Sequence, residues 1–402
     1  IIAEVGIDDD DRAVGSGGFI DITTGFFSAI NGTKLRSSTL QEGNAGNVKI
    51  TAPDGVLFSS GSGVFSQVEE TATGNGGNID ITTDSHYLSE NAELSSSTSG
   101  LGKAGDINLI TKDLTLESGG RISATATETA REGKAGTITV TADRVNLSGE
   151  NSGLFAQTLG NLSAGELKLQ PNQDVQSLIV NLADNAQISA STSSSGKGGT
   201  LTITAPDSIT LTGNGSIVSA ETSGSGTGGD LIFDTGKLTV KDNALVTVSS
   251  VDSGEAGGLT VNADSILLDN QGKIRADTTG GGGDISVNSP LLVLRRGSSI
   301  TTNASGNEIS GGNITIDGKN GFIVALPWEN SDIRADSENF RGGDVTIKNT
   351  AGIYGIFPRT EPLPNSSDIT VKGATPELEG NIEVNPPELG TSSGFIELPE
   401  NL

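Results

Sequence analysis

A six-residue phrase returns at regular intervals along the chain and constrains the fold more than any other feature. It is plainest at 76–81, where two glycines precede Asn-Ile-Asp-Ile. The second glycine marks each copy, and successive copies are 26 to 34 residues apart. Such a period is typical of a solenoid, in which each repeat stacks on its neighbour. The marker glycines are Gly18, Gly46, Gly77, Gly105, Gly136, Gly165, Gly199, Gly229, Gly257, Gly283, Gly312 and Gly343.

Each period contains three short runs with the alternation of a β-strand. In the period that begins at Gly76 the runs are 78–82, 87–88 and 92–96, and a polar loop follows them. Apolar residues alternate with Asn, Thr or Ser, which predicts strands with one buried face. Three strands per turn, each recurring in its own column, predict an all-β parallel β-helix (solenoid) of about 12 coils of roughly 30 residues. We expect a right-handed coil because parallel crossover connections strongly prefer that hand.

The repeat covers most of the chain, so one continuous solenoid is expected rather than several globular domains. Hydrophobic residues make up 33% and aromatics 3% of the sequence, which suits a narrow core that every coil extends a little. We divide the chain into an incomplete leading coil (1–16), β-helix repeats (17–350) and a Pro-rich C-terminal cap and tail (351–402). Proline cannot donate to a strand ladder, so the last segment suits the end of a stack.

The charge balance excludes two classes of partner. With 50 acidic and 24 basic residues the formal charge is −26, and nucleic acid or an anionic membrane would need clustered Lys and Arg. No apolar stretch approaches the roughly 20 residues of a spanning helix, so no membrane insertion is expected. Cys is absent, which excludes disulfides and thiolate sites. The chain begins in mid-pattern at Ile1 and without Met, so we expect a piece of a longer protein.

The glycine pair and the residue after it form a repeated corner. Glycine pairs permit a positive φ at a sharp corner, and Asn or Asp at the next position can hydrogen-bond backbone groups exposed there. This pattern favours a turn-capping ladder over a metal-binding one. Thr137, Glu166, Thr200 and Gly258 interrupt the column. The predicted ladder consists of Asn78, Asp106, Asp230, Asp284, Asn313 and Asp344.

The residues offer little support for catalysis. Glycosidases need two carboxylates about 5 to 9.5 Å apart, and the outward positions of the first strands hold no adjacent pair of acids. The segment 326–340 brings Glu329, Asp332 and Asp336 close in sequence and is the candidate for an enzymatic alternative. His86 is the only His, and without a second one we expect a surface or strand-edge residue. The catalytic, cofactor and metal sets are therefore expected to be empty.

Three further features of the sequence stand out. Trp328, the only Trp, follows a Pro between two strand columns; it could stack on a sugar, and packing over a loop is the alternative. The acidic run 8–11 could bind Ca²⁺ through its oxygens, but its spacing matches no Ca²⁺ motif, and a solvated loop is favoured. The segment 170–176 lengthens one coil and should bulge outward as a loop.

The repeated Gly-Gly-[Asn/Asp]-Ile-x-Ile phrase, the Ile-Ser-Ala strands and the closing runs at 353–358, 367–370 and 380–385 together resemble one family. They are similar to the filamentous-haemagglutinin-like large exoproteins of cyanobacteria, over essentially the whole chain. That resemblance implies a right-handed β-helix exported to the cell surface by two-partner secretion through an outer-membrane transporter. It also implies an adhesin or an extracellular fibre.

Together the residues and the resemblance lead to a functional expectation. We expect a non-enzymatic, extracellular surface or matrix protein, either an adhesin or a fibre subunit. The alternative is a carbohydrate-binding or carbohydrate-cleaving β-helix protein. Expected partners are cell-surface or matrix polysaccharide and a second copy of the chain, joined end to end through an uncovered strand edge.

Overall fold

The computed structural model describes residues 1–4, 14–385 and 395–396, and within them the chain is an all-β solenoid. Its coils recur about 29 residues apart in about 12 turns, which confirms the predicted parallel β-helix. The one helical element in those ranges is the 3₁₀ turn η1 (Pro376–Leu378), and no helix there could cross a membrane. The chain divides into two compact units, residues 1–206 with 217–220, and residues 207–216 with 221–402.

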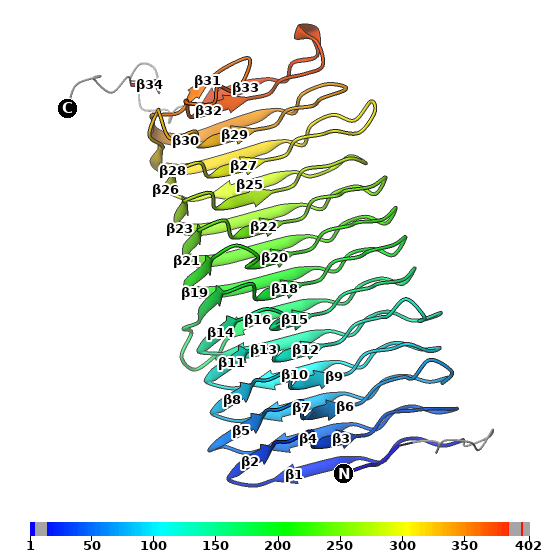
Figure 1. The fold of residues 1–402 in the computed structure, drawn as a ribbon. Helices are drawn as coiled ribbons and strands as arrows, with labels where there is room; N and C mark the ends of the chain where they lie inside the picture. The colour runs from blue at the N-terminus through cyan, green and yellow to red at the C-terminus, as the bar shows by residue number, and fades with distance from the viewer. Residues whose placement is uncertain (5–13, 386–394, 397–402) are drawn as a thin grey trace. The chain divides into compact units, whose positions relative to one another are not determined.

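The first unit has the three strand columns that the sequence predicts (Figure 1). First-column strands are β1 (Ile20–Thr23), β4 (Val48–Thr51), β7 (Ile79–Thr82), β10 (Ile107–Ile110), β13 (Ile138–Ala142) and β16 (Leu167–Pro171). Second-column strands are β2 (Phe26–Ala29), β5 (Gly55–Phe58), β8 (Ser85–Leu88), β11 (Asp113–Glu117), β14 (Arg144–Ser148) and β17 (Ile179–Ala183). Third-column strands are β3 (Lys34–Arg36), β6 (Gly63–Phe65), β9 (Glu93–Ser95), β12 (Arg121–Ser123), β15 (Gly153–Phe155), β18 (Gln187–Ser189) and β20 (Ile217–Ser219).

Parallel pairing in this unit stacks like residues on like. Ile79 pairs with Val48 on one side and with Ile107 on the other, and the side chains of all three are fully buried. Because side chains alternate along a strand, the residues between them point outward. The core is therefore a column of Ile, Val and Leu inside the coil.

In the second unit the first two columns largely fuse. β21 (Leu231–Lys241), β23 (Leu259–Asp269), β28 (Ile314–Val324) and β30 (Val345–Tyr354) each run through both, whereas β25 (Ile285–Asn288) and β26 (Leu291–Leu294) stay separate. Third-column strands are β22 (Leu245–Thr247), β24 (Lys273–Arg275), β27 (Ser299–Thr301), β29 (Asp332–Arg334) and β32 (Asp368–Thr370). The chain first passes from one unit to the other within β19 (Leu201–Thr212). The two columns fuse where the residues that connect them stay paired with the adjacent coil, as Thr235 does with Ala263.

The segment after residue 351 adds strands to the end of the second unit. β31 (Phe357–Pro358) pairs with β32 and is the last strand of the third-column sheet. Pro358 has no backbone N–H, which makes this edge a poor template for a further strand. β33 (Ile382–Asn385) and β34 (Phe395–Ile396) both pair with β30.

The marker glycines are needed for a reason other than the one predicted. Among the glycine pairs of the marker column only Gly282 and Gly283 have positive φ, so left-handed backbone does not explain the column. A Cβ atom on Gly77 would lie 2.2 Å from the carbonyl oxygen of Gly46, the same marker position one coil earlier. Gly105 and Gly136 would meet the preceding marker carbonyl at 2.1 and 1.9 Å. Glycine is therefore required because adjacent coils approach each other closely at this corner.

Candidate functional site

The six predicted ladder residues bind backbone amides, and each amide belongs to the next coil. Asn78 Oδ1 accepts a hydrogen bond from the Asp106 N–H at 3.0 Å, and Asp106 Oδ1 accepts one from the Thr137 N–H at 2.8 Å. In the second unit the matching bonds from Asp230, Asp284, Asn313 and Asp344 measure 2.8 to 3.0 Å. The side chains therefore tie successive coils together and are engaged in structure.

His86 lies inside the coil, so the expectation of a surface or strand-edge residue is wrong. It is the second residue of β8, where it pairs with Val56 and Leu114 in an inward column. Its ring is fully buried and neither nitrogen has a hydrogen-bond partner. Burial lowers its pKa to about 3, which keeps the ring neutral. The alternation that places Leu88 inside also places His86 inside.

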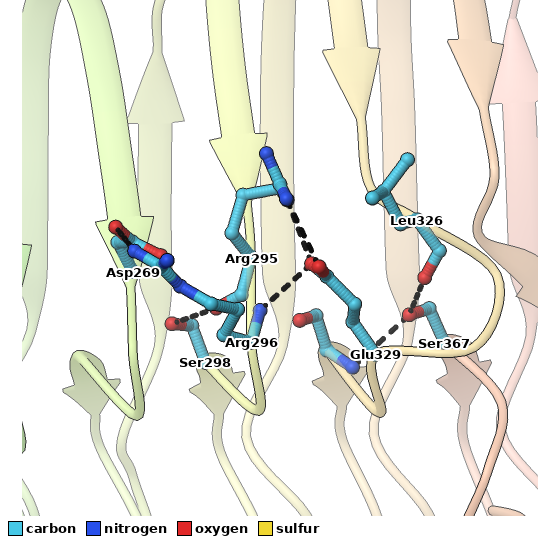
Figure 2. A network of polar contacts seen from close by, with 8 residues as sticks. Asp269, Arg295, Arg296, Ser298, Leu326, Glu329 and Ser367 are labelled. Atoms are coloured by element: carbon cyan, nitrogen blue, oxygen red, sulfur yellow. Dashed lines mark hydrogen bonds and ion pairs between the residues drawn. The ribbon is translucent and has the colours of Figure 1, made fainter.

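Trp328 is exposed on a turn that several contacts hold in place. Its side chain is 69% exposed, and the turn links β28 to β29. Figure 2 shows Glu329, the next residue, reaching Arg295, whose Nε and Nη2 donate to the two carboxylate oxygens at 2.7 and 2.9 Å. At the other side of the turn the Ser367 hydroxyl donates to the Leu326 carbonyl at 2.7 Å. The indole is thus presented to solvent from a fixed backbone.

The ion pair beneath this turn is strengthened by its neighbours. The Arg296 N–H donates to Glu329 at 2.9 Å, and the Arg296 guanidinium pairs with Asp269 on β23. The hydrogen bonds from Arg295 are the main reason that the pKa of Glu329 is lowered. Glu329 is therefore a charged structural partner, and proton transfer is not its natural role.

The other two acids of the enzymatic alternative are also held by protein groups. Asp336 accepts from Arg334 at 2.9 Å, from the Thr370 hydroxyl at 3.0 Å and from the Lys372 N–H at 2.8 Å. Asp332 accepts from the Asp368 N–H at 3.0 Å, and burial raises its pKa to about 6. Both are only 7% exposed. The structure therefore does not place any two of the three predicted acids as an exposed catalytic pair.

A concave surface in the second unit, which we call the trough, combines strand ends and loops from several coils. Its lining includes Arg275, Asp277 and Asn303, at or just beyond the ends of third-column strands. Loop residues also line it, among them Thr279, Ser305 and Glu338. The lining residues Ser250, Thr278 and Ala304 are buried. The cavity measures about 320 Å³.

The polar groups of the trough are fixed by one another. Arg275 donates to Asp277 at 2.9 Å, and the other oxygen of Asp277 accepts from the Asn303 N–H at 2.9 Å. The Asn303 side chain in turn accepts from the Asp336 N–H at 3.0 Å. Guanidinium, carboxylate, amide and hydroxyl groups thus face one open cavity in a set geometry. Such a surface can hydrogen-bond a polyhydroxylated ligand over several coils.

The sequence reasoning missed the trough, although a signal for it exists. The tetrapeptide Ile-Arg-Ala-Asp at 274–277 supplies Arg275 and Asp277 of the trough, and it occurs again at 333–336, where the Asp336 N–H binds Asn303. On a strand this pattern places the Arg and the Asp on the outward face. The loop wall carries no comparable signal, because Thr279, Ser305 and Glu338 have no shared motif.

The metal reading finds no support in the described ranges 1–4, 14–385 and 395–396, where no three His, Cys, Asp or Glu residues form a group that could hold an ion. The acidic run 8–11 lies outside the described residues.

Comparison of the chain with family models, with curated proteins and with solved structures finds no match. The resemblance to the filamentous-haemagglutinin-like exoproteins therefore stays a prediction.

Proposed function

We propose that the chain is a non-enzymatic, extracellular surface or matrix protein whose second unit binds polysaccharide. The observation that carries this proposal is the trough, with its ordered guanidinium, carboxylate, amide and hydroxyl groups. Polysaccharides offer hydroxyl groups at regular intervals, and stacked coils offer partners at a regular spacing of about 4.8 Å. A surface that spans several coils suits an extended ligand.

Trp328 provides a second contact of the type that sugars favour. An exposed aromatic face can stack on the apolar C–H face of a sugar ring, and an aromatic side chain with only two torsion angles loses little conformational entropy on binding. The Arg295–Glu329 pair holds the turn that carries the indole. Trp328 therefore remains our candidate carbohydrate contact, now on a turn with a defined geometry.

The proposed location rests on the composition and the family resemblance. An acidic, Cys-free solenoid suits a protein exported unfolded and folded outside the cell, and the resemblance adds an outer-membrane transporter as the export partner. Antibody labelling of intact producing cells, compared with permeabilised cells, tests this. A labelling signal that appears only after permeabilisation would contradict an extracellular location.

Binding is tested by native affinity electrophoresis of the chain in gels that contain dextran, xyloglucan, alginate or hyaluronan. We expect at least one polysaccharide to retard the wild-type chain. Trp328→Ala removes the indole, and Ser305→Leu narrows the trough at an exposed serine, so both should restore mobility. Ser225→Leu makes the same change at an exposed loop serine that does not line the trough, and it should migrate like wild type.

Two results would contradict the proposal. One is unretarded migration of the wild-type chain in every gel. The other is release of new reducing ends from any of these polysaccharides by the purified chain, which would move it to the carbohydrate-cleaving class.

A further inference from the structure

The insertion at 170–176 in the first unit folds back across earlier coils. Residues 172–176, which follow β16, form a turn in which the Gln176 N–H donates to the Asn172 carbonyl at 2.8 Å. Asn172 Nδ2 then donates to the Thr111 carbonyl at 3.1 Å and to Asp143 Oδ1 at 2.6 Å. Thr111 lies two coils earlier, so the insertion covers the preceding corners instead of pointing away from the coil.

A cavity of about 360 Å³ lies under this turn. Its lining comes from successive corners between the first and second strand columns, and from residues 172–175 of the turn. The corners contribute Pro53, Thr82, Asp84, Ile110, Lys112 and Asp143. This volume lies within the range of small-molecule sites.

A second departure from the repeat falls in the same place. Thr51, Thr82 and Thr141 occupy one outward column, and Ile110 takes the place of Thr between the last two. The Ile110 side chain is 49% exposed, and Val175 on the turn is 57% exposed. Both line the cavity, among mostly polar residues. Two exposed apolar side chains that share one cavity can pack against the apolar face of a ligand, while the polar residues around them fix its orientation.

The remaining polar groups define the chemistry of that occupant. Asp84 pairs with Lys112 at 2.6 Å, and Asp143 binds Asn172. Within the described part of the chain, the side chains of Thr82, Gln173 and Asp174 make no hydrogen bond. They offer hydroxyl, amide and carboxylate partners to a ligand. With three carboxylates and one ammonium group the cavity is negative, which disfavours an anionic ligand.

We infer that this cavity binds a neutral pyranose unit of a glycan. A pyranose has an apolar C–H face that fits Ile110 and Val175, and hydroxyl groups that fit the side chains of Thr82, Gln173 and Asp174. Because the site lies wholly in the first unit, it is separate from the trough and does not depend on the function proposed for it. It adds a neutral-sugar class to the ligands of this chain.

The test measures binding of fluorescently labelled tetrasaccharides of glucose, mannose and galactose, with tetragalacturonate as the acidic probe. At least one neutral probe should bind, and tetragalacturonate should bind more weakly. Ile110→Thr restores the threonine column and should leave the fold intact, yet weaken binding about tenfold by removing the apolar contact. Asp174→Ala should weaken binding as well. Ile232→Thr, the same change at another outward first-strand position, should bind like wild type.

Failure of this inference is distinguishable from failure of the proposed function. Absence of binding by every neutral probe, tighter binding of tetragalacturonate, or unchanged binding by Ile110→Thr would each overturn the pyranose site. If instead only Trp328→Ala and Ser305→Leu weaken binding, the pocket is refuted while the role of the second unit stands.

Discussion

At the scale of single residues, buried polar side chains deviate most from the pattern around them. His86 occupies a position that Val56 and Leu114 fill in the adjacent coils, and nothing in the structure satisfies its ring nitrogens. Leaving a buried polar group without a partner costs roughly 1 to 3 kcal/mol. Its presence is the clearest weak point in the core of the first unit.

His86→Leu should therefore raise the free energy of unfolding at neutral pH, by about 1 to 3 kcal/mol, because it removes the unsatisfied ring. The pKa of His86 is about 3 in the folded chain, against an ordinary value of 6.5 for histidine. The unfolded chain binds more protons between these values, so this residue lowers stability as pH falls below 6.5. Urea unfolding across this range should show less acid destabilisation in the variant. Identical pH profiles for variant and wild type would count against a buried neutral His86.

Asp332 should act in the opposite direction. Its pKa is raised from 3.8 to about 6 by burial, so the folded chain binds more protons between these values and stability falls as pH rises through that window. Asp332→Asn keeps the acceptor for the Asp368 N–H and should remove this decline. Urea midpoints at both ends of the window measure the effect. A variant that keeps the full wild-type slope would contradict the assignment.

At the scale of elements, side-chain hydrogen bonds link one coil to the next. The ladder links Asn78 to Asp106 and Asp106 to Thr137, and so fixes each corner to the next one. The turn that carries Trp328 is held in the same way, by the side chain of Arg295, which follows β26, and by the hydroxyl group of Ser367. Contacts of this kind set the positions of exposed groups that the strands alone leave undefined.

Asn78→Ala should lower the free energy of unfolding by about 0.5 to 1.5 kcal/mol, the usual net value of a hydrogen bond. Thr137→Ala is the matched control, because Thr137 occupies the same column and no side-chain hydrogen bond links it to the next coil in the described structure. Chemical denaturation of both variants measures the difference. Equal losses of unfolding free energy in the two variants would show that the ladder hydrogen bond adds no stability of its own.

The Arg295–Glu329 ion pair, which we call the clamp, leads to a separate prediction about the turn that carries Trp328. Arg295→Ala removes both hydrogen bonds to Glu329 and should give the turn more freedom without unfolding the coils. Since Trp328 is the only Trp, time-resolved fluorescence anisotropy reports on this turn alone. We expect a larger amplitude of fast motion in the variant. Lys319→Ala, a change to an exposed residue outside the clamp, should leave the anisotropy decay unchanged, and an equal change in both would contradict the clamp.

At the scale of the whole molecule, the repeat made the coil predictable and its departures were harder to read. Ile79 and Ile107 show the inward column directly, because alternation is a local property of a strand. Fusion of the first two columns in the second unit depends on pairing of residues such as Thr235, which their own sequence does not reveal. The trough and the pocket under 172–176 combine residues from several coils, so no single stretch identifies them.

The close approach of coils at the marker glycines predicts a sharp asymmetry within one pair. Gly77→Ala places a methyl group against the Gly46 carbonyl and should cost about 1 to 3 kcal/mol or more. Gly76→Ala should cost less, because its methyl group would lie 2.6 Å from the Gly105 nitrogen, a milder clash, and Ala45 and Ala104 occupy the same position in the adjacent coils. Denaturation midpoints compare the two. Equal tolerance at both positions would refute the steric explanation.

Binding of the intact chain to an array of immobilised glycans tests the central claim, that this solenoid is an extracellular polysaccharide-binding protein, most directly. The account predicts signal on a defined group of glycans, which Trp328→Ala and Ser305→Leu reduce and Ser225→Leu leaves unchanged. An array on which the folded wild-type chain binds no glycan would contradict it.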